Sequence, residues 1–268
     1  MNKLQVLVTT MFCEDINIYK KMNISCDTVI ANQADTEDYK EEIKGTQKII
    51  IITTKTRGLS KNRNIAMEHI DDTADCVLFA DDDLWLYDGA HQTILKEFEA
   101  HPEADAIKFN LECISERQIS MKTTTKFHKA ARSELTSAGV CGLAIKKESL
   151  KKSGILFNER FGAGTENYSG EDSIFLQQLI IKGLNVYLSP EFIAKVDQSS
   201  SHWFEGFTEK KFIVSGMIID EIYPHISRLL VLRSAFKMSR RSDVSMSFFK
   251  ILRCYYKGIT KNRKERKL

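Results

Sequence analysis

Short apolar runs alternate with amphipathic stretches through the first 110 residues of the chain. The apolar runs, which predict β-strands, are residues 4–9, 28–31, 48–53, 76–80 and 105–111. Helices are predicted at residues 15–22, 60–70 and 90–101. Ser60 is expected to cap the second of these helices. The alternation of strands and helices predicts an α/β fold with a mostly parallel, Rossmann-like sheet flanked by helices.

The pattern changes after residue 115. Residues 122–129 are polar and suit either an edge strand or a loop. Further strands are predicted at 139–145 and 184–188, and further helices at 147–153 and 171–183. From about residue 226 the sequence is amphipathic and basic, which predicts a separate C-terminal helical extension. We therefore expect two parts, residues 1–225 and residues 226–268.

Composition excludes several classes of protein. Apolar residues make up 43% of the chain, enough for a full core, and no run approaches the 18 apolar residues of a spanning helix. The first residues suit a β-strand better than a signal peptide. Six scattered cysteines form no C-x-x-C pair, so neither a zinc site nor a redox motif is indicated. Without a secretion signal, we expect the reducing cytoplasm.

The net charge of +3 conceals two regions of opposite sign. Residues 226–268 contain 13 Lys and Arg against 2 Asp and Glu, whereas residues 1–225 are acidic overall. Basic blocks of this kind bind polyanions, either membrane surfaces or nucleic acids. The alternative is a tail that packs on the domain and exposes its charges to solvent.

Three consecutive carboxylates, Asp81, Asp82 and Asp83, follow the predicted strand at 76–80. Ligands of open parallel sheets bind beyond the carboxyl ends of the strands. Adjacent like charges repel, so such a cluster is costly unless a cation is present. Carboxylate oxygens suit Mg²⁺ or Mn²⁺, and Mg²⁺ fills the rest of its shell with phosphate and water oxygens. The pattern favours a metal-bound diphosphate over a solvated acidic turn.

Four segments, in order along the chain, resemble the inverting glycosyltransferases of family 2, which have the GT-A fold. They are residues 4–10 (LQVLVTT), residues 58–66 (GLSKNRNIA), the D-x-D-like run 81–83 after its strand, and residues 170–172 (GED). The resemblance covers about residues 1–215. It implies that residues 1–115 bind a nucleotide-sugar and residues 116–225 an acceptor. The resemblance is to bacterial, non-processive members: the Q-x-x-R-W motif of processive synthases is absent, which indicates transfer of a single sugar.

The resemblance implies a set of donor-binding residues. Thr9, at the end of the first strand, and Asp35, after the second, are expected to contact the base or ribose. Arg63 is expected to reach a phosphate or the uracil edge, and Asp81 and Asp82 to bind the nucleotide-sugar. Each of these residues also has an ordinary alternative role, at a strand end, in a loop cap or on an exposed helix face.

The resemblance also implies a metal site with a third ligand from a later loop. Asp83 is the first candidate ligand, together with Asp81, and His202 is the candidate from the later loop. His202 is equally compatible with an ordinary surface position. Trp203, the next residue, is expected either to stack on an acceptor sugar or to anchor the core.

Asp172 occupies the position of the family's catalytic base in the segment 170–172. Transfer to a sugar hydroxyl requires removal of its proton, and a positioned carboxylate accelerates this step by roughly 10²–10⁴-fold. Glu171 is expected to hydrogen-bond the acceptor. Both carboxylates precede an apolar-periodic helix, where acidic residues also serve as caps.

We therefore expect a peripheral cytoplasmic enzyme at the inner face of the cell membrane. It would transfer one sugar from a nucleotide-sugar, expected to be UDP-linked, to a glycan or lipid-linked acceptor in cell-surface polysaccharide synthesis. The basic tail would bind anionic membrane rather than nucleic acid. One alternative is a sugar nucleotidyltransferase, but residues 9–13 lack the glycine-rich loop of that class. The other is a nucleic-acid-binding protein, which leaves the acidic run unexplained and lacks a recognisable motif.

Overall fold

The computed structural model describes residues 1–114, 122–136, 138–197 and 206–267, which form two compact units. Unit 1 comprises Met1–Arg160 and Glu171–Ser200, and unit 2 comprises Phe161–Gly170 and Ser201–Leu268. The division near residue 200 differs from the boundary at 225 that we expected. The difference arises because helix α7 (Glu209–Ile222) packs with the basic C-terminal helices.

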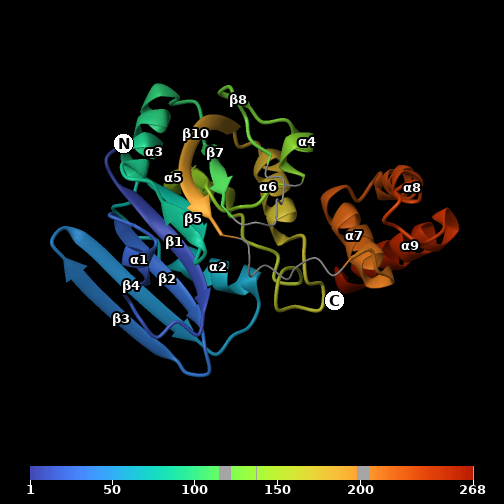
Figure 1. Cartoon of the computed structure of the whole chain (residues 1–268), viewed down its shortest axis with the longest axis horizontal. Helices are drawn as coiled ribbons and strands as arrows, with labels where there is room; N and C mark the ends of the chain where they lie inside the picture. The colour runs from blue at the N-terminus through green and yellow to red at the C-terminus, as the bar shows by residue number, and fades with distance from the viewer. Residues whose placement is uncertain (115–121, 137, 198–205, 268) are drawn as a thin grey trace. The chain divides into compact units, whose positions relative to one another are not determined.

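A mixed β-sheet forms the centre of unit 1 (Figure 1). Its strands are β1 (Leu4–Met11), β2 (Asp27–Gln33), β3 (Asp38–Lys44), β4 (Gln47–Thr54), β5 (Cys76–Asp81), β6 (Leu84–Leu86), β7 (Ala106–Cys113), β8 (His128–Lys129), β9 (Leu143–Lys146) and β10 (Val186–Val196). They follow the order β3-β4-β2-β1-β5-β9-β7-β10-β6, with β8 paired to β10. Strands β4, β2, β1 and β5 are parallel neighbours, whereas β9 runs antiparallel between β5 and β7. The α/β architecture with a GT-A-like sheet is confirmed.

Helices cover both faces of this sheet. In unit 1 they are α1 (Ile18–Lys21), α2 (Leu59–Glu68), α3 (Ala90–Ala100), α4 (Arg132–Leu135), α5 (Lys147–Ser153) and α6 (Glu171–Ile181). On β1, Val6 and Val8 belong to the core cluster that includes residues of α1 and α3. Leu7 belongs to the cluster that includes residues of α2, α5 and α6. Because side chains alternate along a strand, apolar residues at successive positions of β1 supply both layers.

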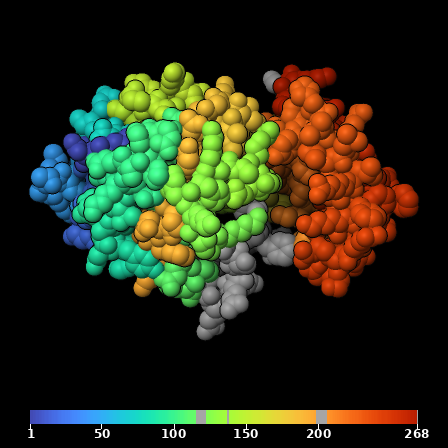
Figure 2. Space-filling model, turned by 90° about the horizontal axis from the view of Figure 1, so that it is seen from above, coloured from blue at the N-terminus to red at the C-terminus, as the bar shows by residue number. Residues whose placement is uncertain are grey.

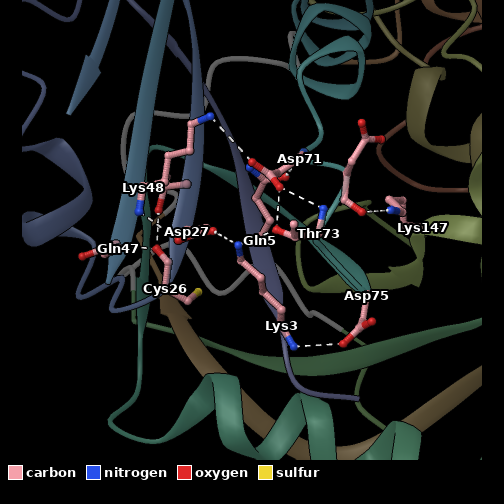
Figure 3. Close-up of polar contacts among 12 residues, drawn as sticks. Lys3, Gln5, Cys26, Asp27, Gln47, Lys48, Asp71, Thr73, Asp75 and Lys147 are labelled. Carbon is pink, nitrogen blue, oxygen red and sulfur yellow. Dashed lines mark hydrogen bonds and ion pairs between the residues drawn. The ribbon is translucent and has the colours of Figure 1, made fainter. Parts of the chain in front are cut away.

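Polar side chains join the amino ends of the parallel strands (Figure 3). Lys3, just before β1, forms a 2.9 Å ion pair with Asp27 at the start of β2. The other oxygen of Asp27 accepts a 2.8 Å hydrogen bond from the backbone N–H of Lys48 on β4. Gln5 accepts a 2.9 Å bond from the backbone N–H of Asp71, which precedes β5. These bonds stabilise the edge of the sheet that lies opposite to the acidic run at residues 81–83.

Three local features differ from the sequence-based expectations. Strand β3 was not expected, because its residues are mostly charged and exposed; it pairs antiparallel with β4 at the sheet edge. The short β6 was also not expected, and β10 is longer than the run at 184–188. Ser60 does not cap α2: it lies buried in the first turn, and Gly58, with a φ of 109°, occupies the N-cap position. A positive φ of this kind favours glycine.

Three helices form the core of unit 2, namely α7, α8 (Ser227–Met238) and α9 (Phe248–Glu265) (Figure 2, orange to red). Helices α7 and α9 approach closely at two glycines. A Cβ atom at Gly216 would overlap the backbone of Tyr255, and one at Gly258 would overlap the carbonyl of Ile213. Glycine at these positions therefore permits the backbone contact. Among the described residues, no helix is long and apolar enough to cross a membrane.

A fully buried carboxylate, Asp220 on α7, links the three helices of unit 2. One oxygen accepts a 2.7 Å bond from the Ser227 hydroxyl of α8 and bonds from Arg263 of α9 at 2.9 and 3.0 Å. The other oxygen accepts bonds from Asn262 and Arg266. Burial acts to raise the pKa of Asp220, but the hydrogen bonds from Arg263, Ser227 and Asn262 outweigh it and lower that pKa. The network stabilises the ionised carboxylate inside the helix bundle.

Candidate active site

The acidic run lies where β5 ends, beside the end of β1. Thr9 and Asp81 are register partners in this parallel pair. The Thr9 hydroxyl donates a 2.7 Å hydrogen bond to Asp81, and the Thr10 hydroxyl donates a 2.5 Å bond to Asp82. The first two carboxylates of the run are thereby oriented by the neighbouring strand. This is the carboxyl edge of the parallel strands, where ligands of α/β sheets bind.

Helix α2 places Arg63 between two carboxylates from distant parts of unit 1. Its Nη2 donates to both oxygens of Asp81, at 3.1 and 3.2 Å, and its Nη1 donates to Asp172. The Arg63 side chain is only 3% exposed, and its guanidinium lies over the Phe157 ring at 5.2 Å. A planar guanidinium suits such a site because it can donate to two acceptors from a fixed geometry.

Two asparagines flank Arg63 and fix the position of α2. Asn62 donates to the backbone carbonyls of Thr10 and Ala31, at the ends of β1 and β2. Asn64 accepts a 2.8 Å bond from the backbone N–H of Phe157 and donates to the carbonyl of the same residue. The contacts of these two asparagines with neighbouring backbone groups thus hold segment 58–66 in place and orient Arg63 toward the carboxylates.

Asp172 lies in the first turn of α6 and has a partner on each oxygen. Oδ1 accepts from Arg63, and Oδ2 accepts a 3.1 Å bond from the backbone N–H of Val140. Neighbouring Glu171 is differently placed: burial and the Asp172 charge raise its pKa to about 7, and Arg63 offsets only part of this rise. Glu171 therefore tends to hold a proton near neutral pH.

Asp82 and Asp83 lie beside a hollow of about 300 Å³ whose lining also includes Lys21, Cys13 and Trp85. Burial, and then the charges of Asp81 and Asp82, raise the pKa of Asp83 to about 7. Burial also raises the pKa of Asp82. By contrast, burial of Asp81 is outweighed by the Arg63 charge and by hydrogen bonds from Cys141 and Thr9, and its pKa is lowered.

The donor set suits a hard divalent cation at Asp83. The exposed Asp82 and the half-buried Asp83 both have raised pKa values, and a cation would stabilise their ionised forms. Asp81 differs, because Thr9 and Arg63 already engage its oxygens. Within the described ranges, no group of three His, Cys, Asp or Glu side chains is arranged to hold a metal. Asp82 and Asp83 therefore fit a metal that completes its shell with phosphate oxygens and water.

Of the remaining predicted residues, the structure describes Asp35, which has no contact with this cluster among those found. Asp35 is exposed over 83% of its side chain and pairs with Arg57. His202 and Trp203 lie outside the described residues.

Lys108 on β7 belongs to the cluster, and the sequence reading did not single it out. Its ammonium donates to the carbonyls of Phe109 and Cys141, at 3.0 and 2.7 Å. Burial lowers the pKa of Lys108 to about 8, although the nearby Cys141 and Asp172 act to raise it. The available signal was a lysine in the middle of the predicted strand 105–111, between Ile107 and Phe109.

Comparisons with known proteins bear on the fold of this chain. Residues 24–152 match the model of glycosyl transferase family 2. Residues 1–349 of S. aureus TarS in complex with UDP-GlcNAc are similar in structure, with a TM-score of 0.62 and 16% identity, over 89% of this chain and 73% of that one. A second structure of the same TarS region matches over 97% of this chain and 89% of that one, with the same TM-score and identity.

Longer TarS chains extend beyond this protein. The chain covers 44% of the more complete S. aureus TarS structure, at 16% identity and a TM-score of 0.60. A search of curated protein sequences found no match. At such identity the structural likeness establishes the shared fold. Residues 24–152 are therefore similar to glycosyl transferase family 2, and the chain shares its fold with TarS.

Proposed function

We propose that this protein is an inverting hexosyltransferase that moves one sugar from a UDP-linked donor to a hydroxyl of a glycan or lipid-linked acceptor. The observation that carries the proposal is the buried Arg63 bridge between Asp81, at the end of β5, and Asp172, at the start of α6. It joins the acidic run expected on the donor side to the carboxylate expected on the acceptor side. The UDP-GlcNAc in the similar TarS structure supports a UDP-linked donor.

On the donor side, Asp83 and Asp82 would hold Mn²⁺ or Mg²⁺, and Thr9 would contact the nucleotide. The metal, when bound, would offset the charge that develops on the departing diphosphate. Asp81 orients Arg63, and Arg63 in turn positions Asp172. This positioning role is separate from any contact of Arg63 with a phosphate. Asp35 and His202 remain candidates for the ribose and the metal, respectively.

On the acceptor side, Asp172 takes the proton from the attacking hydroxyl. The hydroxyl oxygen forms a bond to the anomeric carbon on the face opposite the nucleotide, and the bond from that carbon to the diphosphate oxygen breaks with its electron pair. A single displacement of this kind inverts the anomeric centre. Glu171 and Trp203 are the proposed acceptor contacts, and Glu171 can donate a hydrogen bond while it holds a proton.

For the cellular setting, we propose synthesis of a bacterial cell-surface polysaccharide by a non-processive enzyme. The basic residues 226–268 would bind an anionic membrane, which would place the protein peripherally at the inner, cytoplasmic face. The mixed positive charge and apolar content of this region support that partner.

The test mixes the protein with a panel of nucleotide-sugars, with and without Mn²⁺. It measures thermal stabilisation of the protein and release of nucleoside diphosphate. Asp172→Asn should retain donor binding while transfer falls by roughly 10²–10⁴-fold. Asp83→Ala should lose the metal-dependent part of nucleoside diphosphate binding. Asp72→Asn is a matched carboxylate control: Asp72 is exposed, precedes β5 at the opposite edge of the sheet and has no proposed role. Near-normal transfer by Asp172→Asn would refute the base, and unchanged metal-dependent binding by Asp83→Ala would refute the metal site.

A further inference from the structure

Helix α8 of unit 2 carries large apolar side chains on its outer face. These are Ile226 just before the helix, Leu229, Leu232 and Phe236, which are 48%, 70%, 45% and 51% exposed. Their spacing of three, three and four residues places them on one side of a helix. The opposite side is used internally, since Val231 and Ala235 are buried in the unit 2 core. The outer face is therefore apolar without contributing to the core.

Cations surround these apolar side chains. Arg228, Arg233, Lys237 and Arg240 are exposed, and α8 itself contains no Asp or Glu. Among the residues that the structure describes, these four form no ion pair, whereas Lys250 and Lys261 on α9 pair with Glu209 and Glu166. The Arg240 guanidinium lies over the Phe236 ring at 4.0 Å. The outer face thus combines exposed apolar groups with uncompensated positive charge.

This combination favours one kind of occupant. A helix with large apolar side chains and flanking cations is suited to lie in the interface of an anionic bilayer. A second copy that presented the same face would bring cations against cations, which is unfavourable. On α9 the one strongly exposed apolar side chain among the described residues is Phe249, in the first turn, at 79% exposure. The middle of its exposed face instead carries the cations Arg253 and Lys257, with the ring of Tyr256 between them.

We propose that the outer face of α8 docks on the surface of an anionic lipid bilayer. Leu229, Leu232 and Phe236 enter the boundary between headgroups and acyl chains, and Arg233 and Lys237 face the lipid phosphates. The inference rests on the membrane partner proposed above for residues 226–268. It assigns that contact to α8 and not to the basic face of α9.

The experiment measures binding of the full chain to phosphatidylcholine vesicles with and without phosphatidylglycerol. Arg233→Gln with Lys237→Gln should weaken binding to the anionic vesicles by about 30-fold, since each cation near such a surface contributes about a five-fold factor. Leu229→Gln with Phe236→Gln keeps the charge and should weaken binding by more than about 10-fold, because it removes the inserted groups.

The matched control, Arg253→Gln with Lys257→Gln, removes the same charge from α9 in the same unit. It should change binding by less than about three-fold if α8 makes the contact. Equal weakening by the α8 and α9 pairs would overturn the proposal in favour of general charge attraction. Absence of binding by the unaltered chain would also overturn it. A change in oligomeric state of the Leu229 and Phe236 variant, with unchanged vesicle binding, would instead identify an interface between copies.

Two further measurements separate this inference from the proposed activity. Thermal unfolding shows that each variant is folded. Hydrolysis of the donor in solution should be the same for all three variants, because none of them alters the candidate active site. Vesicle binding without hydrolysis or transfer of any donor would refute the proposed activity and support α8 docking. Hydrolysis or transfer of a donor without vesicle binding would support the activity and refute α8 docking.

Discussion

Arg63 and Asp172 lie 109 positions apart in the sequence and form a part-buried ion pair in the structure. The same guanidinium donates to both oxygens of Asp81. The pair therefore fixes the start of α6 relative to the end of β5 within unit 1. It also means that the carboxylate proposed as the base is positioned by an arginine and by a backbone N–H, and not by solvent.

Replacement of Arg63 tests whether this bridge matters for the chemistry. Arg63→Lys keeps a positive charge but cannot donate to Asp81 and Asp172 with the same planar geometry. We expect kcat to fall by about 10-fold or more, while the KM for the donor changes less, because the base is misplaced. Steady-state kinetics with a soluble acceptor measure the effect. Arg241→Lys, on the exposed Arg241–Asp243 pair, is the control and should behave like the unaltered protein.

Arg63→Met should instead lower stability. It leaves two carboxylates without their buried cation, and the loss of one partner of a buried pair costs about 3–5 kcal/mol. Chemical denaturation would measure the free energy of unfolding. An unchanged midpoint would show that solvent already satisfies Asp81 and Asp172.

Glu171 should make stability depend on pH. Burial and the Asp172 charge raise its pKa in the folded state to about 7, whereas the unfolded pKa lies near 4.5. Between these values the folded state holds a proton that the unfolded state has lost, so the free energy of unfolding should decrease as pH rises from about 4.5 to 7. Denaturation series at several pH values should show a smaller decrease for Glu171→Gln, which cannot ionise. Identical pH profiles would contradict the raised pKa.

Gly258 should be intolerant of a side chain because α7 and α9 touch there through backbone atoms. In Gly258→Ala the new Cβ would overlap the Ile213 carbonyl, so the helices must separate. We expect unit 2 to lose about 1–3 kcal/mol of stability, the usual cost of overpacking. Thr260→Ala, on the exposed side of the same helix, is the matched control. A Gly258→Ala protein as stable as the control would show that the close approach is not required.

Asp220 should be the most sensitive polar residue of unit 2. Asp220→Ala removes the acceptor shared by Arg263, Arg266, Asn262 and Ser227, and we expect a loss of about 3–5 kcal/mol. Its pKa is lowered in the folded state, so the contribution is present at neutral pH and is lost as pH falls through the acidic range. Acid denaturation of the unaltered protein and of Asp220→Asn would measure how the free energy of unfolding changes with pH. This change should be smaller in the variant.

The local pattern determined much of unit 1. Apolar runs at 4–9, 48–53 and 76–80 became β1, β4 and β5, because strands buried on both faces must be apolar throughout. The carboxylates after the run at 76–80 were predicted to lie at the ligand edge, and the structure places them there beside β1. Strand β3 escaped prediction because it gains backbone pairing with β4 and almost no burial, so its composition resembles that of a loop.

The sequence by itself determined most of the order of strands and helices in unit 1, the acidic run after β5 and the carboxylates that begin α6, since these depend on neighbouring residues. Only the tertiary structure decided that Arg63 joins Asp81 to Asp172, that Lys108 lies in the same cluster, and that residues 161–170 belong with α7 and α9 in unit 2. The physical reason is that each of these relationships depends on contacts between segments far apart in the chain. The polar residue types concerned are equally stable on an exposed surface, so local pattern alone does not distinguish the two positions.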